Sequence, residues 1–129
     1  MGAQQIEAVA AVARRVVPAE GVIEDRTRLR TYEGDGLAHY RVTPALVVIP
    51  EDAEQLGRIV AACAEHGVPY VARGSGTGLS GGALPHAEGV LVVTSRMREI
   101  LEVRREDQRA LVEPGVINLD VTKAATPDG

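Results

Sequence analysis

Three short apolar runs divide the middle of the chain into its predicted elements. Residues 46–49 (Leu-Val-Val-Ile) and 90–93 (Val-Leu-Val-Val) are continuous apolar runs, which are typical of strands covered on both faces of a parallel sheet. Residues 69–72 form a third strand. Between the strands at residues 46–49 and 69–72, Asp52 begins a helix with Gln55 as its capping partner, and Gly67 ends this helix. Strand, helix and strand together predict a βαβ unit.

The remaining segments show weaker or different periodicity. Apolar residues at helical spacing predict a helix that ends before Pro18, and residues 19–45 are expected to be irregular. Residues 100–104 and 109–112 read as two strands joined by a polar turn, which predicts an antiparallel hairpin. Residues 117–125 have weak helical character.

Composition limits the classes of function. The chain has 129 residues, of which 45% are hydrophobic and only 2% aromatic, so one globular domain with an aliphatic core is expected. A net charge of −4 and the scarcity of aromatic residues argue against nucleic-acid binding. The single Cys63 excludes an internal disulfide and a cysteine metal cluster. The N-terminal residues lack a signal-peptide pattern, and no apolar run is long enough to span a bilayer. We therefore expect a cytoplasmic protein, with membrane association only through a partner.

The candidate chemistry lies in a glycine-rich loop between the predicted strands at residues 69–72 and 90–93. It contains Gly74, Gly76, Gly78, Gly81 and Gly82, and it leaves the carboxyl end of a predicted parallel strand, where open α/β sheets bind ligands. Backbone N–H groups turned into one concavity form a nest for an anion. The hydroxyls of Ser75 and Thr77 would add donors, and Arg73 is either a phosphate clamp or a surface charge. The alternative is a flexible loop with no ligand.

Two familiar motifs match this loop but fail on context. Residues 76–81 satisfy the dinucleotide fingerprint G-x-G-x-x-G, and residues 78–82 match the nucleophile elbow G-x-S-x-G. Both motifs require a helix directly after the loop, and Gly82, Pro85 and Gly89 oppose one. No Walker lysine is present. The remaining interpretation is a phosphate-binding loop that no helix follows.

Several segments in order resemble one family. Residues 69–82 (Pro-Tyr-Val-Ala-Arg-Gly-Ser-Gly-Thr-Gly-Leu-Ser-Gly-Gly) resemble the pyrophosphate loop of FAD-linked oxidases of the vanillyl-alcohol oxidase (PCMH-type) superfamily. Residues 32–37, 43–52 and 112–118 are similar to further family segments, and the resemblance extends over about residues 20–129. The most similar branch contains the FAD-binding subunit of glycolate oxidase and its D-lactate dehydrogenase relatives.

The resemblance implies an α+β fold, namely a PCMH-type FAD-binding domain. In that domain a small βαβ subdomain with parallel strands is followed by the start of an antiparallel subdomain. We expect the helix and a wrapping segment in residues 1–45, the α/β subdomain in 46–94 and the second, incomplete subdomain in 95–129. The expected FAD-binding residues are Arg73, Gly74, Ser75, Gly76, Thr77, Gly78, Leu79, Ser80, Gly81, Gly82, Pro114, Gly115 and Val116.

The resemblance also implies an activity. It implies the N-terminal, FAD-binding part of an enzyme that oxidises a small 2-hydroxy acid, with hydride passing from the α-carbon to the flavin. Partner subunits of an oxidase complex are expected as well. The family's catalytic groups follow this region, so we assign no catalytic residue and no metal ligand here. Residues 1–129 alone are expected to fold marginally and to bind FAD weakly or not at all. The alternative function is a truncated, non-catalytic accessory or interaction module that no longer binds flavin.

Overall fold

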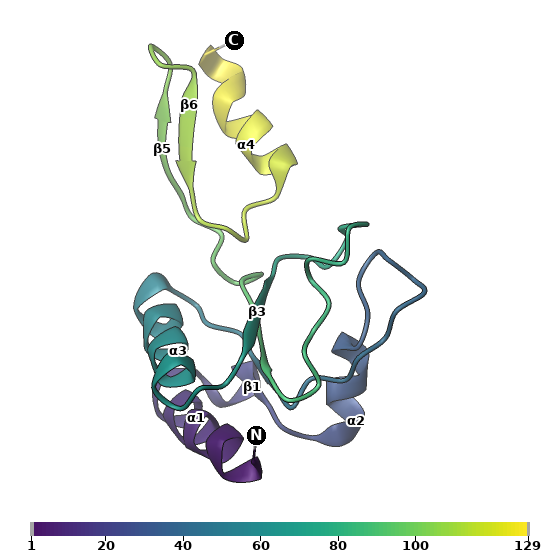
Figure 1. The fold of residues 1–129 in the computed structure, drawn as a ribbon. Coiled ribbons are helices and arrows are strands. Elements are labelled where there is room, and N and C mark those ends of the chain that lie inside the picture. The colour runs from purple at the N-terminus through teal and green to yellow at the C-terminus, as the bar shows by residue number, and fades with distance from the viewer. Residues whose placement is uncertain (1, 129) are drawn as a thin grey trace.

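The computed structural model describes residues 2–128, and Figure 1 shows a parallel-sheet layer with a separate hairpin and helix beyond one edge of that sheet. The elements in chain order are α1 (Ala3–Val16), η1 (Ala19–Gly21), β1 (Val22–Ile23), α2 (Arg26–Leu29), η2 (Arg30–Tyr32), β2 (Leu46–Val48), α3 (Ala53–Glu65), β3 (Tyr70–Arg73), β4 (Val90–Val93), β5 (Ile100–Arg104), β6 (Arg109–Val112), α4 (Asn118–Ala125) and η3 (Thr126–Asp128). The expected α+β fold is confirmed.

The main sheet has the strand order β1-β2-β4-β3. Strands β2, β3 and β4 are parallel, with Val47 and Val71 both opposite Leu91. The three predicted apolar runs therefore form a parallel sheet, but β4 lies between β2 and β3. The predicted βαβ unit joins β2 and β3, which are not neighbours in the sheet because β4 pairs with both of them.

Strands β2 and β4 are covered on both faces. Leu46, Val48, Val90 and Val92 contact α1 and α3 on one face, and Val47 and Leu91 contribute to a second cluster with Leu29 and Tyr32 on the other. Burying each such aliphatic side chain contributes about 1.5–3 kcal/mol to stability. Continuous apolar strands follow directly from this two-sided burial.

Helix α3 begins and ends as its sequence predicts. The Asp52 carboxylate accepts a hydrogen bond of 2.8 Å from the Gln55 N–H, and the Gln55 side chain accepts one from the Glu51 N–H. Gly67 has φ +64°, a left-handed conformation that stops the helix at low cost. Cys63 is fully buried on the inner face, and burial raises the pKa of its thiol to about 11, so it is a core residue.

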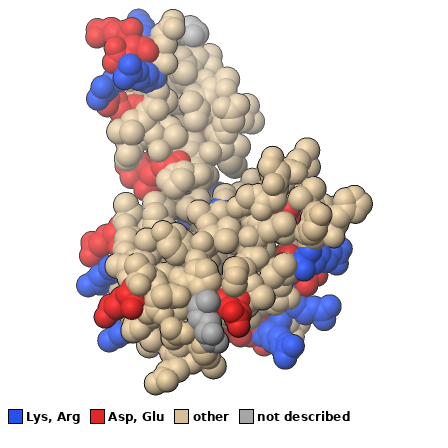
Figure 2. Space-filling view, viewed as in Figure 1, with Lys and Arg blue, Asp and Glu red and all other residues tan. Residues whose placement is uncertain are grey.

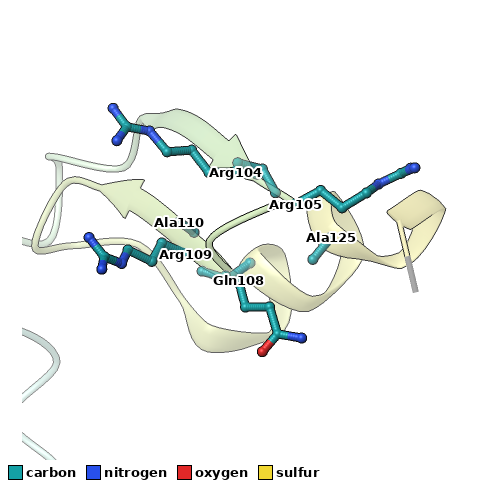
Figure 3. Close-up of a pocket in the computed structure, with 8 residues that line it drawn as sticks. Arg104, Arg105, Gln108, Arg109, Ala110 and Ala125 are labelled. Atoms are coloured by element: carbon teal, nitrogen blue, oxygen red, sulfur yellow. The ribbon is translucent and has the colours of Figure 1, made fainter.

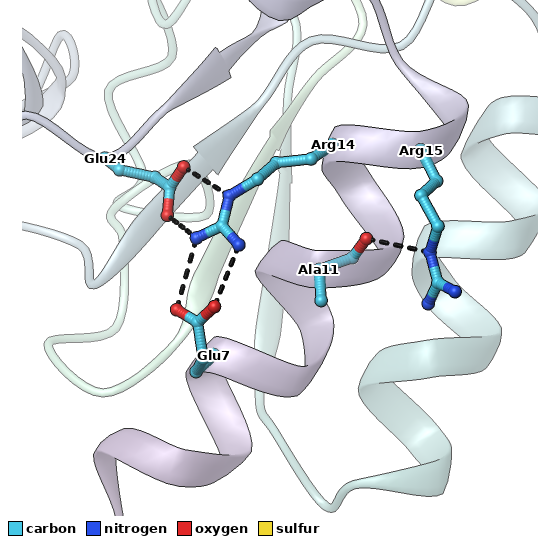
Figure 4. A network of polar contacts seen from close by, with 5 residues as sticks. All are labelled: Glu7, Ala11, Arg14, Arg15 and Glu24. Carbon is cyan, nitrogen blue, oxygen red and sulfur yellow. Dashed lines mark hydrogen bonds and ion pairs between the residues drawn. The ribbon is translucent and has the colours of Figure 1, made fainter.

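The segment before β2, which we expected to be irregular, contains short elements. Val22 and Ile23 form an antiparallel edge strand on β2, with Val22 opposite Val48. Helix α1 is tied to this region by Arg14, whose guanidinium donates to Glu24 and Glu7, and Figure 4 shows it held between both carboxylates. Two residues are too few to produce a periodic pattern, so β1 could not be found in the sequence.

The predicted hairpin and final helix are both present. Strands β5 and β6 pair antiparallel, with Val103 opposite Ala110 and a bulge between Ile100 and Glu102. Helix α4 lies beside them (Figure 1). Figure 2 shows acidic and basic side chains gathered together at the hairpin tip and along the flanks of the sheet layer. Across residues 2–128, no helix has both the length and the apolar character that crossing a bilayer requires.

Candidate FAD site

The glycine loop lies at the carboxyl end of β3, as predicted. Residues 74–89 connect β3 to β4 without any helix, so the structural context that the dinucleotide fingerprint and the nucleophile elbow both require is missing. Thr94, at the carboxyl end of β4, is bonded to the residue before the loop: its N–H donates to the Arg73 carbonyl at 2.8 Å. We call this contact the base of the loop. The loop is therefore anchored at the sheet edge where parallel α/β sheets place their ligands.

The loop glycines fall into two groups. Gly76 and Gly81 have φ values of +73° and +78°, which favour glycine for backbone reasons alone. Gly74, Gly78 and Gly82 lie outside that region of φ, and a Cβ added to any of them would meet no atom of the chain within 4 Å. The fold itself gives no reason for glycine at these three positions.

The loop also presents unused hydrogen-bond donors. Within residues 2–128, none of the backbone N–H groups from Gly74 to Gly82 donates a hydrogen bond. The hydroxyls of Ser75 and Thr77 lie 3.3 Å apart on the exposed side of the loop, and Ser80 and Leu79 are exposed as well. Free N–H groups and paired hydroxyls form a donor set suited to an anion such as a pyrophosphate.

Arg73 lies at the start of the loop, but its side chain turns into the protein. Only 7% of the residue is exposed. Its Nε and Nη2 donate to the Ala83 carbonyl at 3.1 and 2.7 Å, and its Nη1 donates to the Tyr32 carbonyl at 3.1 Å. Burial lowers the pKa of the guanidinium and the negative charge of Asp35 opposes that shift, so Arg73 remains charged. The direct phosphate clamp stays a prediction, while the observed contacts tie the two ends of the loop together.

The second group of expected FAD-binding residues lies on the other side of Thr94. The Gly115 N–H donates to the Met97 carbonyl at 2.8 Å. A Cβ at Gly115 would lie 2.1 Å from the Thr94 carbonyl oxygen and 2.6 Å from that of Met97. The structure thus places Pro114, Gly115 and Val116 against the turn that seals the loop base. It brings the two predicted parts of the site to the same edge of the sheet.

One contributor to this site was missed by sequence analysis. A Cβ at Gly36 would lie 2.5 Å from the Thr77 carbonyl oxygen and 2.7 Å from that of Gly78, and the Leu37 side chain lies against Gly81. The sequence indicates that residues 32–37 are similar to a family segment, but it gives them no role in the site. The two glycines at positions 34 and 36 were the available signal, but nothing in the sequence indicates which of them meets the loop.

A separate pocket lies between the hairpin and α4, away from the glycine loop. Its apolar lining comes from Val103, Ala110, Val121 and Ala125. Figure 3 shows Arg104 and Arg109 extending to one side of the hairpin and Arg105 to the other, so their charges do not converge on one ligand. Among residues 2–128, no group of His, Cys, Asp and Glu side chains is arranged to hold a metal ion.

Comparison with known proteins identifies the family. The model of the FAD-binding domain matches residues 44–129, which include the glycine loop and the Gly115 turn. The chain belongs to the FAD-binding domain family. The cofactor of this family is FAD, and the free N–H groups and open glycine positions of the loop fit a pyrophosphate. Which residues of this FAD-binding domain contact FAD stays a prediction.

Relatives with curated names share much of this FAD-binding domain. The chain is 46% identical over 114 residues to glycolate oxidase subunit GlcD of Escherichia coli (strain K12), which covers 88% of this chain and 23% of that protein. The Bacillus subtilis (strain 168) subunit of the same name is 40% identical over 98 residues, covering 76% and 21%. The D-lactate dehydrogenase of Archaeoglobus fulgidus is 38% identical over 84 residues, covering 65% and 19%. The chain therefore spans about a quarter of the length of these relatives.

Solved structures share the fold. The 4-ethylphenol oxidase of Gulosibacter chungangensis superposes with a TM-score of 0.83 at 26% identity, covering 100% of this chain and 26% of that one. The p-cresol methylhydroxylase superposes with a TM-score of 0.80 at 19% identity, covering 99% and 26%. The arrangement of parallel sheet, glycine loop and antiparallel hairpin is thus the PCMH-type FAD-binding fold.

Proposed function

We propose that residues 74–82 hold the pyrophosphate of FAD through their backbone N–H groups, with the Ser75 and Thr77 hydroxyls as further donors. Residues 114–116 complete the site from the other side of Thr94. A hydrogen bond to a charged group is worth about 1.5–3 kcal/mol. Three or four such bonds suffice to hold a dianionic group in a protein of net charge −4.

One observation carries this proposal: the open space at Gly74, Gly78 and Gly82. Glycine costs the folded state roughly 0.5–1 kcal/mol relative to alanine where regular structure would accept either. These three positions gain nothing inside the chain in return. A group that approaches the backbone closely, as a phosphate does, accounts for all three.

The activity that we propose is oxidation of a small 2-hydroxy acid, of the glycolate or D-lactate type, in the complete polypeptide that contains residues 1–129. The names of the relatives support it, namely a glycolate oxidase subunit and a D-lactate dehydrogenase. Bound FAD supplies the oxidant, because it accepts the hydride that leaves the α-carbon as the hydroxyl becomes a carbonyl. The residues described here bind and orient the cofactor, and we assign no proton transfer to any of them.

The same reasoning extends to the setting of the protein. We propose partner subunits of an oxidase complex, as the word subunit in the relatives' names suggests, and a cytoplasmic location with peripheral membrane contact only through those partners. The division into residues 1–45, 46–94 and 95–129 also stays a proposal. Helix α1 and strand β1 share one core with the parallel sheet, which favours treating the first two parts as one folding unit.

Titration of the complete polypeptide with three flavins tests the proposal. FAD carries the pyrophosphate, FMN one phosphate and riboflavin none, so we expect FAD to bind at least 100-fold more tightly than riboflavin, a difference of about 2.8 kcal/mol. Flavin fluorescence gives each Kd. Equal affinity for FAD and riboflavin would contradict the pyrophosphate role. Anaerobic addition of glycolate or D-lactate should then bleach the visible absorbance of the bound flavin, and no bleaching by any 2-hydroxy acid would contradict the activity.

A further inference from the structure

The glycine loop is backed by residues that lie about forty positions earlier in the chain. The α-carbon of Gly36 faces two carbonyl oxygens of the loop: an added Cβ would lie 2.5 Å from the Thr77 oxygen and 2.7 Å from the Gly78 oxygen. Leu37 continues this contact, since its Cδ2 would lie 3.3 Å from a Cβ at Gly81. We call Gly36 and Leu37 the backing pair.

These contacts fix the position of two loop N–H groups. In a trans peptide the carbonyl and the N–H lie on opposite sides of the same unit, and the described chain contains no cis peptide. The Thr77 carbonyl shares its unit with the Gly78 N–H, and the Gly78 carbonyl shares its unit with the Leu79 N–H. Both peptide units therefore pack against Gly36, which fixes the position of the N–H groups that they carry.

The same two peptide units border open space. A Cβ on Gly78 would meet no atom of the chain within 4 Å, and Leu79 is 74% exposed. Neither N–H donates a hydrogen bond within residues 2–128. The two donors thus lie on peptide units that pack against the backing pair, have no acceptor in the described chain and border open space that an anion can reach.

Arg73, at the start of the loop, also connects the loop to the segment behind it. Its guanidinium joins the Ala83 carbonyl, at the far end of the loop, to the Tyr32 carbonyl, just before the backing pair. The loop and the segment behind it are thus fastened together by one buried side chain. A lysine keeps the charge but cannot make this forked contact to both carbonyls.

We propose that Gly36 is a positioning residue for the FAD site: by packing against the Thr77 and Gly78 peptide units, it holds the Gly78 and Leu79 N–H groups where the pyrophosphate binds. This inference rests on the proposed function of the loop. Gly36 has no positive φ, so the room it leaves for the two loop carbonyls is the reason for glycine there. A side chain at Gly36 would push the loop away or turn its peptide units.

The test compares Gly36→Ala with Gly34→Ala in the complete polypeptide. Gly34 is a matched control, because a Cβ there meets only the Tyr40 carbonyl oxygen, at an ordinary 3.9 Å. We expect Gly36→Ala to weaken FAD binding at least tenfold and to speed hydrogen exchange of the Leu84 N–H, which donates to the Gly81 carbonyl at 3.2 Å, in the apoprotein, and Gly34→Ala to change neither. Wild-type FAD affinity in Gly36→Ala, or equal losses in both variants, would overturn the inference.

Two further measurements keep the test decisive. If Gly36→Ala fails to fold, Arg73→Lys is used instead, and it should show the same faster exchange of the Leu84 N–H in the apoprotein together with weaker FAD binding. A direct phosphate contact from Arg73 would weaken binding without altering exchange in the apoprotein, and that outcome contradicts the tie described above. Failure of the proposed function itself is distinct, because the wild type would then not prefer FAD to riboflavin.

Discussion

The two parts of the proposed FAD site use glycine in opposite ways. At the Gly115 turn the chain itself occupies the space beside the α-carbon, with the Thr94 carbonyl oxygen 2.1 Å from the position of a Cβ. In the glycine loop, a Cβ added to Gly74, Gly78 or Gly82 would have no atom of the chain within 4 Å. One glycine is required by internal packing, and three are not.

This difference separates structural from ligand-related glycines without any bound cofactor. Gly115 would be needed whether or not FAD binds, because the turn must lie against the end of β4. In the proposed function, Gly74, Gly78 and Gly82 make room for a second molecule. Changes at the two kinds of position should therefore affect different measurements.

The largest effect is expected for Gly115→Ala. A methyl group cannot fit 2.1 Å from a backbone oxygen, so the turn must move away from Thr94, and such overpacking costs about 3 kcal/mol. Chemical denaturation of the complete polypeptide without FAD should show this loss. Unchanged stability would mean that the turn yields easily and that Gly115 is not a structural glycine.

Gly78→Ala should weaken FAD binding without destabilising the apoprotein, unlike Gly115→Ala. We expect the FAD Kd to rise at least tenfold, about 1.4 kcal/mol, because the methyl group takes the space where the phosphate approaches. The free energy of unfolding of the apoprotein should stay the same or rise by up to about 1 kcal/mol, since the site is open, its φ is not positive and alanine restricts the unfolded chain. Flavin titration and apoprotein denaturation measure the two quantities. A stability loss like that of Gly115→Ala would remove the distinction between the two regions.

Gly76 should fall between these cases. Its φ of +73° makes Gly76→Ala cost about 1 kcal/mol in the apoprotein, and FAD binding should weaken as the strained loop shifts. Gly76→Asn should recover part of the stability, since asparagine tolerates the left-handed region better than alanine. Thermal unfolding of the two apoprotein variants compares them, and equal losses would argue against backbone strain as the cause. Because strain and ligand blockade coincide here, Gly78 is a better position than Gly76 for testing cofactor binding.

The smallest effect is expected for Gly57→Ala, the control for open space. Gly57 also has no atom within 4 Å of an added Cβ, but it lies in α3, where alanine favours the helix. The variant should gain about 0.5 kcal/mol in stability and keep the wild-type FAD Kd. Weaker FAD binding in this variant would show that the effect of Gly78→Ala is not specific to the loop.

Much of the fold and part of the site could be predicted from local patterns. Continuous apolar runs are produced by burial on both faces, so β2 and β4 were visible as strands. The Asp52 cap and Gly67 are local chemistry that depends on a few neighbouring residues. The glycine loop was visible because its residue types are unusual, and the absence of a following helix could be inferred from Gly82, Pro85 and Gly89.

Other features depend on contacts that no local pattern encodes. The two-residue strand β1 exists only because β2 offers it an edge, and β4 enters between β2 and β3 although it follows them in sequence. The side chain of Arg73 could equally have faced a ligand, and its burial against Tyr32 and Ala83 follows from how the loop folds back.

By itself, the sequence determined the longer elements, the loop and the family of this FAD-binding domain, because periodic burial, caps and glycine-rich motifs are properties of short segments. Only the tertiary structure decided which glycines make room for the chain and which make room for a ligand. That distinction depends on approaches between backbones distant in sequence, such as Gly36 to Thr77 and Gly115 to Thr94. Such approaches arise from packing, and residues that are alike in sequence thereby acquire different roles.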